Sequence, residues 1–167
     1  MKAIALFFKE YLMHIESMDL MRYFITNYLQ NMKGCSILDI GSRKVRSEQD
    51  TYRKLFAEYH YVGMDIVSGE NVDIVGYENI SGVYDVVISG QTMEHVEYPW
   101  EFLINLKKYF KAYICIIAPF KGREHKYPLD TYRYFPGGMR ALFKYAGITE
   151  LEIFKDKVDT IGIGEVI

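Results

Sequence analysis

The chain has 167 residues, a length over which one domain can bury a substantial core. Half of the residues are hydrophobic, a composition that excludes intrinsic disorder. The net charge of −2 argues against a general nucleic-acid-binding protein, because such proteins usually carry a basic face. We therefore expect one globular domain spanning residues 1–167, with nucleic acid an unfavourable partner.

The two cysteines, Cys35 and Cys115, lie beside or within apolar segments typical of strands. Buried free thiols are therefore predicted, and these are typical of a reducing compartment. No cysteine spacing typical of a metal site occurs, so no metal is predicted. Lys9 and Glu10 interrupt the apolar start, and no segment reaches the roughly 18 apolar residues of a membrane span. These features predict a cytoplasmic protein.

Two helices are predicted at the beginning of the chain. Apolar residues recur at helical spacing over residues 4–15 and again over residues 20–32. Asp19 is a candidate cap for the second helix, and Gly34 follows its predicted end. The first helix is interpreted either as a lid over a ligand or as a docking surface.

From residue 36 onward, segments with the pattern of strands alternate with segments that have the pattern of helices. The predicted strands are 36–40, 61–66, 72–75, 84–89, 113–118, 148–154 and 160–167. The predicted helices are 47–59 in part, 100–110 and 138–145. This alternation predicts an α/β fold in which helices cover both faces of a mostly parallel sheet, with the last two strands as an antiparallel pair.

Ligands of such sheets bind beyond the carboxyl ends of the strands, where the strand order reverses. Gly41 follows the first predicted strand, Asp65 ends the second, and Ser89, Gly90 and Gln91 follow the fourth. These positions therefore converge on one edge of the sheet. A glycine turn followed by an acid on the next strand is the combination that an adenosine-containing ligand requires.

The loop after the first strand distinguishes between cofactors. A dinucleotide site requires G-x-G-x-x-G, whereas residues 41–47 read GSRKVRS and lack the second and third glycines. A pyrophosphate site is therefore disfavoured, although the basic residues of this loop keep it as an alternative. S-adenosylmethionine has no phosphate and needs only space for adenosine, an acid for the ribose and polar groups for its amino-acid end.

Four stretches in a fixed order carry a resemblance to a known family. They are Ile37–Arg43, Tyr61–Ile66, Tyr84–Ser89 running into Met93–Val96 and Pro99–Trp100, and His125–Pro136 followed by Gly138 and Leu142–Gly147. Over roughly residues 20 to 155 the chain resembles the class I S-adenosylmethionine-dependent methyltransferases. It is most similar to small prokaryotic methyltransferases of the type 11 kind, which are associated with cell-surface glycan synthesis.

This resemblance implies a three-layer Rossmann-like domain with seven strands, the last antiparallel, and S-adenosylmethionine as cofactor with S-adenosylhomocysteine (SAH) as product. It places the methionyl part near Gly41 and Ser42, the ribose on Asp65, and the sulfonium near residues 89–91. The sequence departs from the family at Arg43, where a second glycine is usual, and at Tyr77, where an acid is common. The implied cofactor residues are Asp39, Gly41, Ser42, Arg43, Asp65, Ile66, Tyr77, Ser89, Gly90 and Gln91. Asp39 has the alternative role of holding the loop amides, and Asp65 that of a turn cap.

The segment 120–136 is the candidate for substrate chemistry, because long loops in compact domains are usually functional or disordered. His125 is the candidate general base for an oxygen or nitrogen nucleophile, oriented by Asp130. Candidate substrate-binding residues are His95, Arg123, Tyr127 and Arg133. In the alternative interpretation, His95 packs within the protein, and residues 120–136 form a charged loop exposed to solvent that has no role in substrate chemistry.

The sequence thus predicts a methyltransferase that O-methylates a small molecule or a sugar or glycan precursor. One alternative is a non-catalytic cofactor-binding or interaction module of the same fold. A second is a nucleotide-dependent oxidoreductase, which the missing glycines disfavour. The acceptor and the oligomeric state are left open by the sequence.

Overall fold

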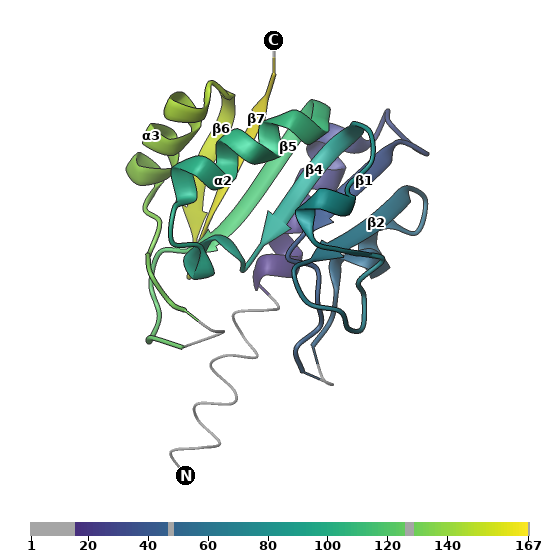
Figure 1. The fold of residues 1–167 in the computed structure, drawn as a ribbon. Helices are drawn as coiled ribbons and strands as arrows, with labels where there is room; N and C mark the ends of the chain where they lie inside the picture. The colour runs from purple at the N-terminus through teal and green to yellow at the C-terminus, as the bar shows by residue number, and fades with distance from the viewer. Residues whose placement is uncertain (1–15, 47–48, 126–128, 167) are drawn as a thin grey trace.

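The computed structural model describes residues 16–46, 49–125 and 129–166. Its centre is a seven-stranded sheet with the strand order β3-β2-β1-β4-β5-β7-β6 (Figure 1). The pairs from β3 to β5 are parallel, whereas β7 is antiparallel to both β5 and β6. The predicted α/β class, the mostly parallel seven-stranded sheet and the antiparallel last strand are therefore confirmed.

The strands lie close to the segments predicted from their apolar patterns. Their bounds are β1 Ser36–Ile40, β2 His60–Asp65, β3 Ile74–Val75, β4 Tyr84–Gly90, β5 Phe110–Pro119, β6 Thr149–Asp156 and β7 Asp159–Glu165. The central strands β1, β4 and β5 are buried over most of their length, because helices cover them on both faces. In the final pair, β6 forms the edge of the sheet and β7 lies between β6 and β5.

Two hydrophobic clusters divide the protein into three layers. On one face, α2 (Pro99–Leu106) and α3 (Pro136–Ala146) pack on the sheet through residues such as Leu103 and Phe143. On the other face lie the helical residues 16–24, the π-helical turn Ile25–Leu29 and the 3-10 turn Tyr52–Phe56. Figure 1 shows α2 and α3 in front of the sheet and the purple N-terminal segment behind it.

The close approach of α3 to the sheet depends on a glycine. A Cβ atom at Gly162 of β7 would lie 2.9 Å from side-chain atoms of both Met139 and Phe143. The same helix ends at Gly147, which adopts a left-handed conformation with φ of 66° and donates its N–H to the carbonyl of Lys144 at 3.2 Å. The left-handed conformation of Gly147 therefore ends the helix at the residue predicted from the sequence.

Two local expectations are wrong. Asp19 is not a helix cap, because residues 16–24 are already helical and its carboxylate pairs with Arg22 one turn later, at 2.5 Å. The predicted helix 47–59 is, in its described part, only the short 3-10 turn Tyr52–Phe56. One turn is enough to bury Phe56, so its apolar spacing does not require a longer helix. The predicted helix over residues 4–15 lies outside the described residues.

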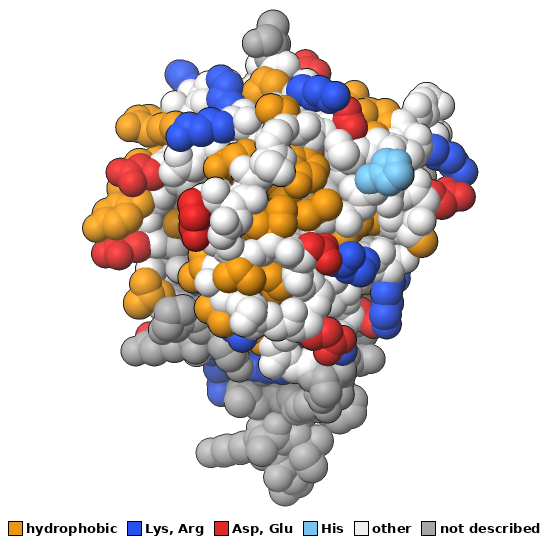
Figure 2. Space-filling model, turned by 45° about the vertical axis from the view of Figure 1, so that its right-hand side comes forward, with side chains coloured by type: hydrophobic (Ala, Val, Ile, Leu, Met, Phe, Trp, Pro, Cys, Tyr) orange, Lys and Arg blue, Asp and Glu red, His pale blue; other side chains and the backbone are white. Residues whose placement is uncertain are grey.

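The face on the β2 side of the sheet has an apolar centre. Figure 2 shows hydrophobic side chains gathered in the middle of this view, with acidic and basic side chains around them.

The edge strand β3 has only two residues, and short edge strands give other chains little backbone to pair with. Among the described residues, no helix has the length and apolarity needed to cross a membrane.

Candidate functional site

A pocket opens at the carboxyl ends of β1 and β4, where the strand order reverses. Its empty space, with the open mouth included, is about 410 Å³. The lining residues are Ser17, Met18, Asp39, Gly41, Ser42, Arg43, Gln49, Asp50, Thr51, Tyr52, Asn71, Gly90 and Gln91. Of the residues implied for the cofactor, six therefore lie together here: Asp39, Gly41, Ser42, Arg43, Gly90 and Gln91.

Parallel pairing brings these segments to the same edge. Ile40 of β1 pairs with Met64 of β2, and Asp39 pairs with Ile88 of β4. Beyond the last pair, the N–H groups of Gly41 and Ser42 both donate to the carbonyl of Met64, at 2.8 and 3.0 Å. The turn after β1 is therefore held against the end of β2.

Gly41 can be replaced by no other residue without strain. Its φ of 79° lies in the left-handed region, and an added Cβ would overlap the side chain of Thr92. Thr92 in turn directs its hydroxyl to the carbonyls of Gly90 and Ile40, at 3.2 and 3.4 Å. The bare backbone at Gly41 is thus part of the wall between the ends of β1 and β4.

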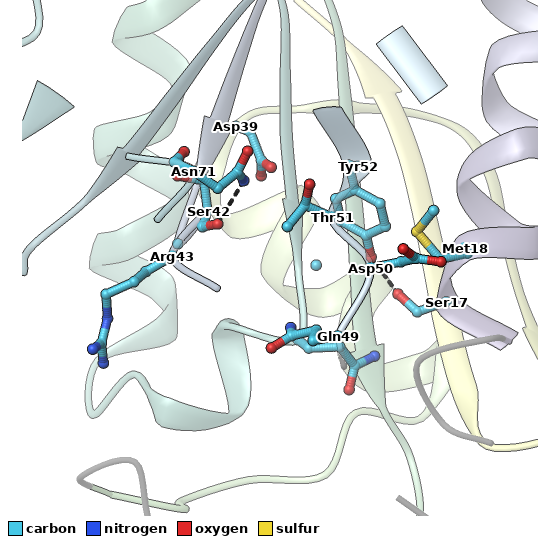
Figure 3. A pocket seen from close by; sticks show the side chains of 13 residues that line it. Ser17, Met18, Asp39, Ser42, Arg43, Gln49, Asp50, Thr51, Tyr52 and Asn71 are labelled. Carbon is cyan, nitrogen blue, oxygen red and sulfur yellow. Dashed lines mark hydrogen bonds between the residues drawn. The ribbon is translucent and has the colours of Figure 1, made fainter. Parts of the chain in front are cut away.

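Asp39 is buried and forms part of a polar chain beside the pocket (Figure 3). The hydroxyl of Tyr61 donates to the Asp39 carboxylate, and Asn71 donates its side-chain N–H to the Tyr61 hydroxyl at 3.2 Å. Burial raises the pKa of Asp39 to about 7, although the Tyr61 hydrogen bond acts in the opposite direction. The structure thus shows both a structural contact for Asp39 and its place in the pocket wall.

The opposite wall comes from segments distant in sequence. Figure 3 shows Tyr52, Asp50 and Ser17 on one side of the pocket and Asp39, Ser42 and Asn71 on the other. The Tyr52 hydroxyl forms a hydrogen bond with the Ser17 hydroxyl, which ties the N-terminal helical segment to the pocket. A Cβ at Gly90 would overlap the Tyr52 ring, so the missing side chain of Gly90 makes room for Tyr52.

The end of β4 is fixed by its own hydrogen bonds. The buried hydroxyl of Ser89 donates to the carbonyl of Ile40 at 2.8 Å, and Ser89 is not among the lining residues. Gln91 has a φ of 56°, and its N–H donates to the carbonyl of Ile117 at 2.9 Å. A non-glycine residue in this conformation is uncommon and is a recognised feature of functional turns.

Three implied cofactor residues lie outside the lining of the pocket: Asp65 and Ile66 at the end of β2, and Tyr77 after β3. Asp65 accepts the N–H groups of Arg43 and Val67 at 3.2 and 3.0 Å, so its carboxylate joins two loops. Ile66 is exposed next to it. Tyr77 is half-buried in a 3-10 turn after β3, and burial raises the pKa of its phenol to about 12.

The described part of the loop after β5 is organised by Asp130. Its buried carboxylate accepts two hydrogen bonds from Arg133, at 2.5 and 2.8 Å, and one from the main-chain N–H of His125 at 2.6 Å. These contacts, with Arg133 the largest, lower the pKa of Asp130 to about 2. Arg133 also donates to the carbonyl of Arg123 at 2.9 Å. Arg133 is therefore engaged in holding this loop.

His95 and His125, predicted in separate motifs, lie edge to face with ring centroids 5.1 Å apart. His125 Nδ1 is 3.5 Å from the Asp130 carboxylate, and His95 Nδ1 contacts the carbonyl of Leu129. Burial lowers the pKa of His95 below its ordinary value. The predicted substrate residue Tyr127 lies outside the described residues.

Sequence reasoning missed one half of the pocket. Ser17, Tyr52 and Asn71 belong to segments without a motif, and their places depend on how the chain packs beside β1. The sequence also predicted no role for Glu94, which adjoins His95 and is fully buried. A charged residue in a segment that otherwise packs against the core is the one signal that could have indicated it.

No family model matches the sequence, and no curated protein matches it. Solved structures do match. The N-terminal domain of EvdMO1 with SAH bound has a TM-score of 0.61 and 17% identity, over 90% of this chain and 81% of that one, and was also crystallised in the presence of SAH and D-fucose. A SAM-dependent methyltransferase from Aquifex aeolicus has a TM-score of 0.61 and 18% identity, over 81% and 84% of the two chains.

A third match is the magnesium protoporphyrin IX methyltransferase ChlM from Synechocystis PCC 6803 with bound SAH. It has a TM-score of 0.67 and 13% identity, over 92% of this chain and 83% of that one. At these identities the likeness concerns the arrangement of the chain, and each match covers most of both proteins. The protein thus has the Rossmann-like fold of the S-adenosylmethionine-dependent methyltransferases.

Proposed function

We propose that this protein is an S-adenosylmethionine-dependent methyltransferase. The observation that carries the proposal is the pocket at the reversal of strand order, whose lining includes Gly41 and Gly90. This is the position at which open α/β sheets bind nucleoside ligands. The solved structures with the same fold include methyltransferases crystallised with bound SAH, which supports the same cofactor for this chain.

The residues present fit this cofactor. Gly41 and Gly90 leave bare backbone in the lining, with Thr92 and Tyr52 packed where their side chains would lie, and a Cβ at Gly41 would strain the turn. Ser42, Gln91 and Asp39 offer polar groups for the amino-acid end. Asp65 would hold the ribose, since a carboxylate has about four lone-pair sites and can accept further hydrogen bonds beside its two loop amides. Ile66 and Tyr77 would flank the adenine.

The lining does not have the basic character that a bound pyrophosphate would need. The lining has two carboxylates, Asp39 and Asp50, and one basic residue, Arg43. Figure 3 shows the Arg43 guanidinium extending away from the other lining residues. A dinucleotide would bring two phosphate charges to a site with this balance, so the oxidoreductase alternative has little support.

The cofactor, when bound, supplies a methyl group on a positively charged sulfur, which leaves as a neutral thioether. The protein's task is to align the acceptor and exclude water, and ideal alignment can contribute about 7–11 kcal/mol. A hydroxyl acceptor must also lose a proton. We propose that His125, held beside Asp130, takes this proton, and that His95 and Arg123 contact the acceptor together with Tyr127 and Arg133.

The proposed acceptor is a hydroxyl of a small molecule or of a sugar or glycan precursor. The EvdMO1 domain was crystallised in the presence of D-fucose, which supports a sugar, whereas ChlM, with the same fold, is a magnesium protoporphyrin IX methyltransferase. We place the reaction in the cytoplasm, because Cys35 and Cys115 are both free thiols, as expected in a reducing compartment.

Isothermal calorimetry with SAH tests the cofactor assignment. The wild-type protein should bind one SAH per chain, and Asp65→Ala should weaken binding by about tenfold or more, the loss of a pair of charged hydrogen bonds. Asp19→Asn is the matched control, because Asp19 is an exposed carboxylate in a surface pair with Arg22. Unchanged affinity in Asp65→Ala would remove Asp65 from the site. Tight SAH binding with no methyl transfer to any pool of acceptors would favour the non-catalytic module.

A further inference from the structure

Three potential metal ligands meet beside the sheet: the adjacent residues Glu94 and His95, and His125 from a later part of the chain. One oxygen of Glu94 and one nitrogen each of His95 and His125 lie within 4.8 Å of one another. His95 Nε2 is 3.8 Å from Glu94 Oε1. Two histidines and one carboxylate are a common ligand set for divalent transition metals, including catalytic zinc and non-haem iron.

Glu94 is the unusual member of this cluster. The residue is fully buried, and neither of its carboxylate oxygens has a hydrogen-bond partner among the described residues. Burying a carboxylate that lacks a hydrogen-bond partner is costly, because the group loses its hydration. Burial accordingly raises the pKa of Glu94 to about 8. A cation between Glu94 and the two imidazoles would satisfy these oxygens.

The surroundings of the two histidines are those of metal ligands. His95 Nδ1 contacts the carbonyl of Leu129, which directs Nε2 towards Glu94. His125 Nδ1 lies 3.3 Å from the carbonyl oxygen of Arg123 and 3.5 Å from Asp130 Oδ2, so we assign its Nε2 to the metal. Metal-binding histidines almost always have their second nitrogen on a carbonyl or carboxylate in this manner, which fixes the ring and its tautomer.

We propose that Glu94, His95 and His125 form a binding site for one divalent transition-metal ion of the zinc type. Ligand atoms in a tetrahedral zinc site are about 3.3 Å apart, so the three groups need to approach by roughly an ångström. Three protein ligands leave at least one position open for water or a substrate oxygen. The spacing of residues in the sequence does not indicate this cluster. The loop after β5 brings His125 to Glu94 and His95 only in the folded protein.

The site suggests how an acceptor could be activated, a role that rests on the proposed function. A hydroxyl bound at the open position would have its pKa lowered by the cation, much as zinc lowers that of water. With the ion bound, His125 would be a metal ligand in place of the general base, and the bound hydroxyl would release its proton to solvent water. Metal binding itself requires no cofactor and can be tested without it.

The test uses untagged, chelator-treated protein in the absence of S-adenosylmethionine. Competition with a chromogenic chelator should give one tightly bound Zn²⁺ per chain, and Co²⁺ should give visible absorption bands of a protein-bound ion. His125→Ala, His95→Ala and Glu94→Gln should each weaken Zn²⁺ binding by roughly tenfold or more. His60→Ala is the matched control, because His60 is exposed in β2.

Two results would overturn the metal site. One is the absence of saturable binding of Zn²⁺ and Co²⁺ to the wild-type protein. The other is Zn²⁺ binding in His125→Ala and Glu94→Gln that equals the wild type, because it would place the ion elsewhere. Glu94→Gln preserves the side-chain shape, and circular dichroism shows whether each variant is folded. SAH binding by the same samples reports separately on the proposed function.

Discussion

The side chain of Thr92 occupies the space that a side chain at Gly41 would need. Gly41 directly follows β1, and Thr92 lies just beyond the end of β4. The Thr92 hydroxyl contacts the carbonyls of Ile40 and Gly90, the last residues of these two strands. The width of the pocket at this edge therefore depends on a glycine with a positive φ and on the residue packed against it.

Gly41→Ala should reduce both stability and cofactor binding. The left-handed conformation costs an alanine about 1–2 kcal/mol, and the overlap with Thr92 adds to this cost. Gly34→Ala is the matched control, because Gly34 has a φ of 78° and nothing within 4 Å of an added Cβ. Urea unfolding and SAH calorimetry should show a larger stability loss in Gly41→Ala, with the affinity lost in that variant alone. Equal effects of the two substitutions would contradict the role of the Gly41–Thr92 contact.

The Asp39 carboxyl should make stability depend on pH. Burial raises its pKa to about 7 in the folded protein from an ordinary 3.8, so between these values the folded state holds a proton that the unfolded state has released. The free energy of unfolding should therefore fall as pH rises through this window. Asp39→Asn lacks this proton, so its stability relative to the wild type should increase from acidic to neutral pH. Urea unfolding of both proteins across the window checks this, and parallel curves would rule it out.

Asp85 should have the opposite pH dependence. The N–H and hydroxyl of Ser36, at 2.8 and 2.7 Å, and the Lys111 ammonium lower the pKa of Asp85 from 3.8 to about 2. Its stabilising effect is therefore complete above the unfolded pKa and is lost as pH falls towards the folded one. Asp85→Asn should cost about 1–3 kcal/mol near neutral pH, and less as pH falls. A difference between wild type and variant that stays constant down to the folded pKa would disprove this account.

The sheet could be predicted because its strands carry continuous apolar runs. Residues 36–40 and 113–118 are buried on both faces, and glycine or polar turns separate them from the next segment. Residues 47–59 misled the same reasoning, because Tyr52 and Phe56 reach the core from a single 3-10 turn. The spacing of apolar residues alone does not show how many helical turns a segment forms when it buries two aromatic rings.

The site could be predicted only where it lies at strand ends. Gly41, Gly90 and Gln91 follow apolar strands, so topology alone brings them to one edge. Tyr52 and Ser17 enter the pocket through packing between segments far apart in the chain, which no local pattern encodes. For the same reason, the approach of His125 to Glu94 and His95 could not be predicted from the sequence.

The central claim is that the pocket between the ends of β1 and β4 binds S-adenosylmethionine and its product. The most direct measurement is a titration of ¹⁵N-labelled protein with SAH, followed by heteronuclear NMR. The account predicts saturable shifts concentrated at the amides of Gly41, Ser42, Gly90 and Gln91. Spectra that stay unchanged at millimolar SAH, or shifts confined to residues away from this edge of the sheet, would contradict it.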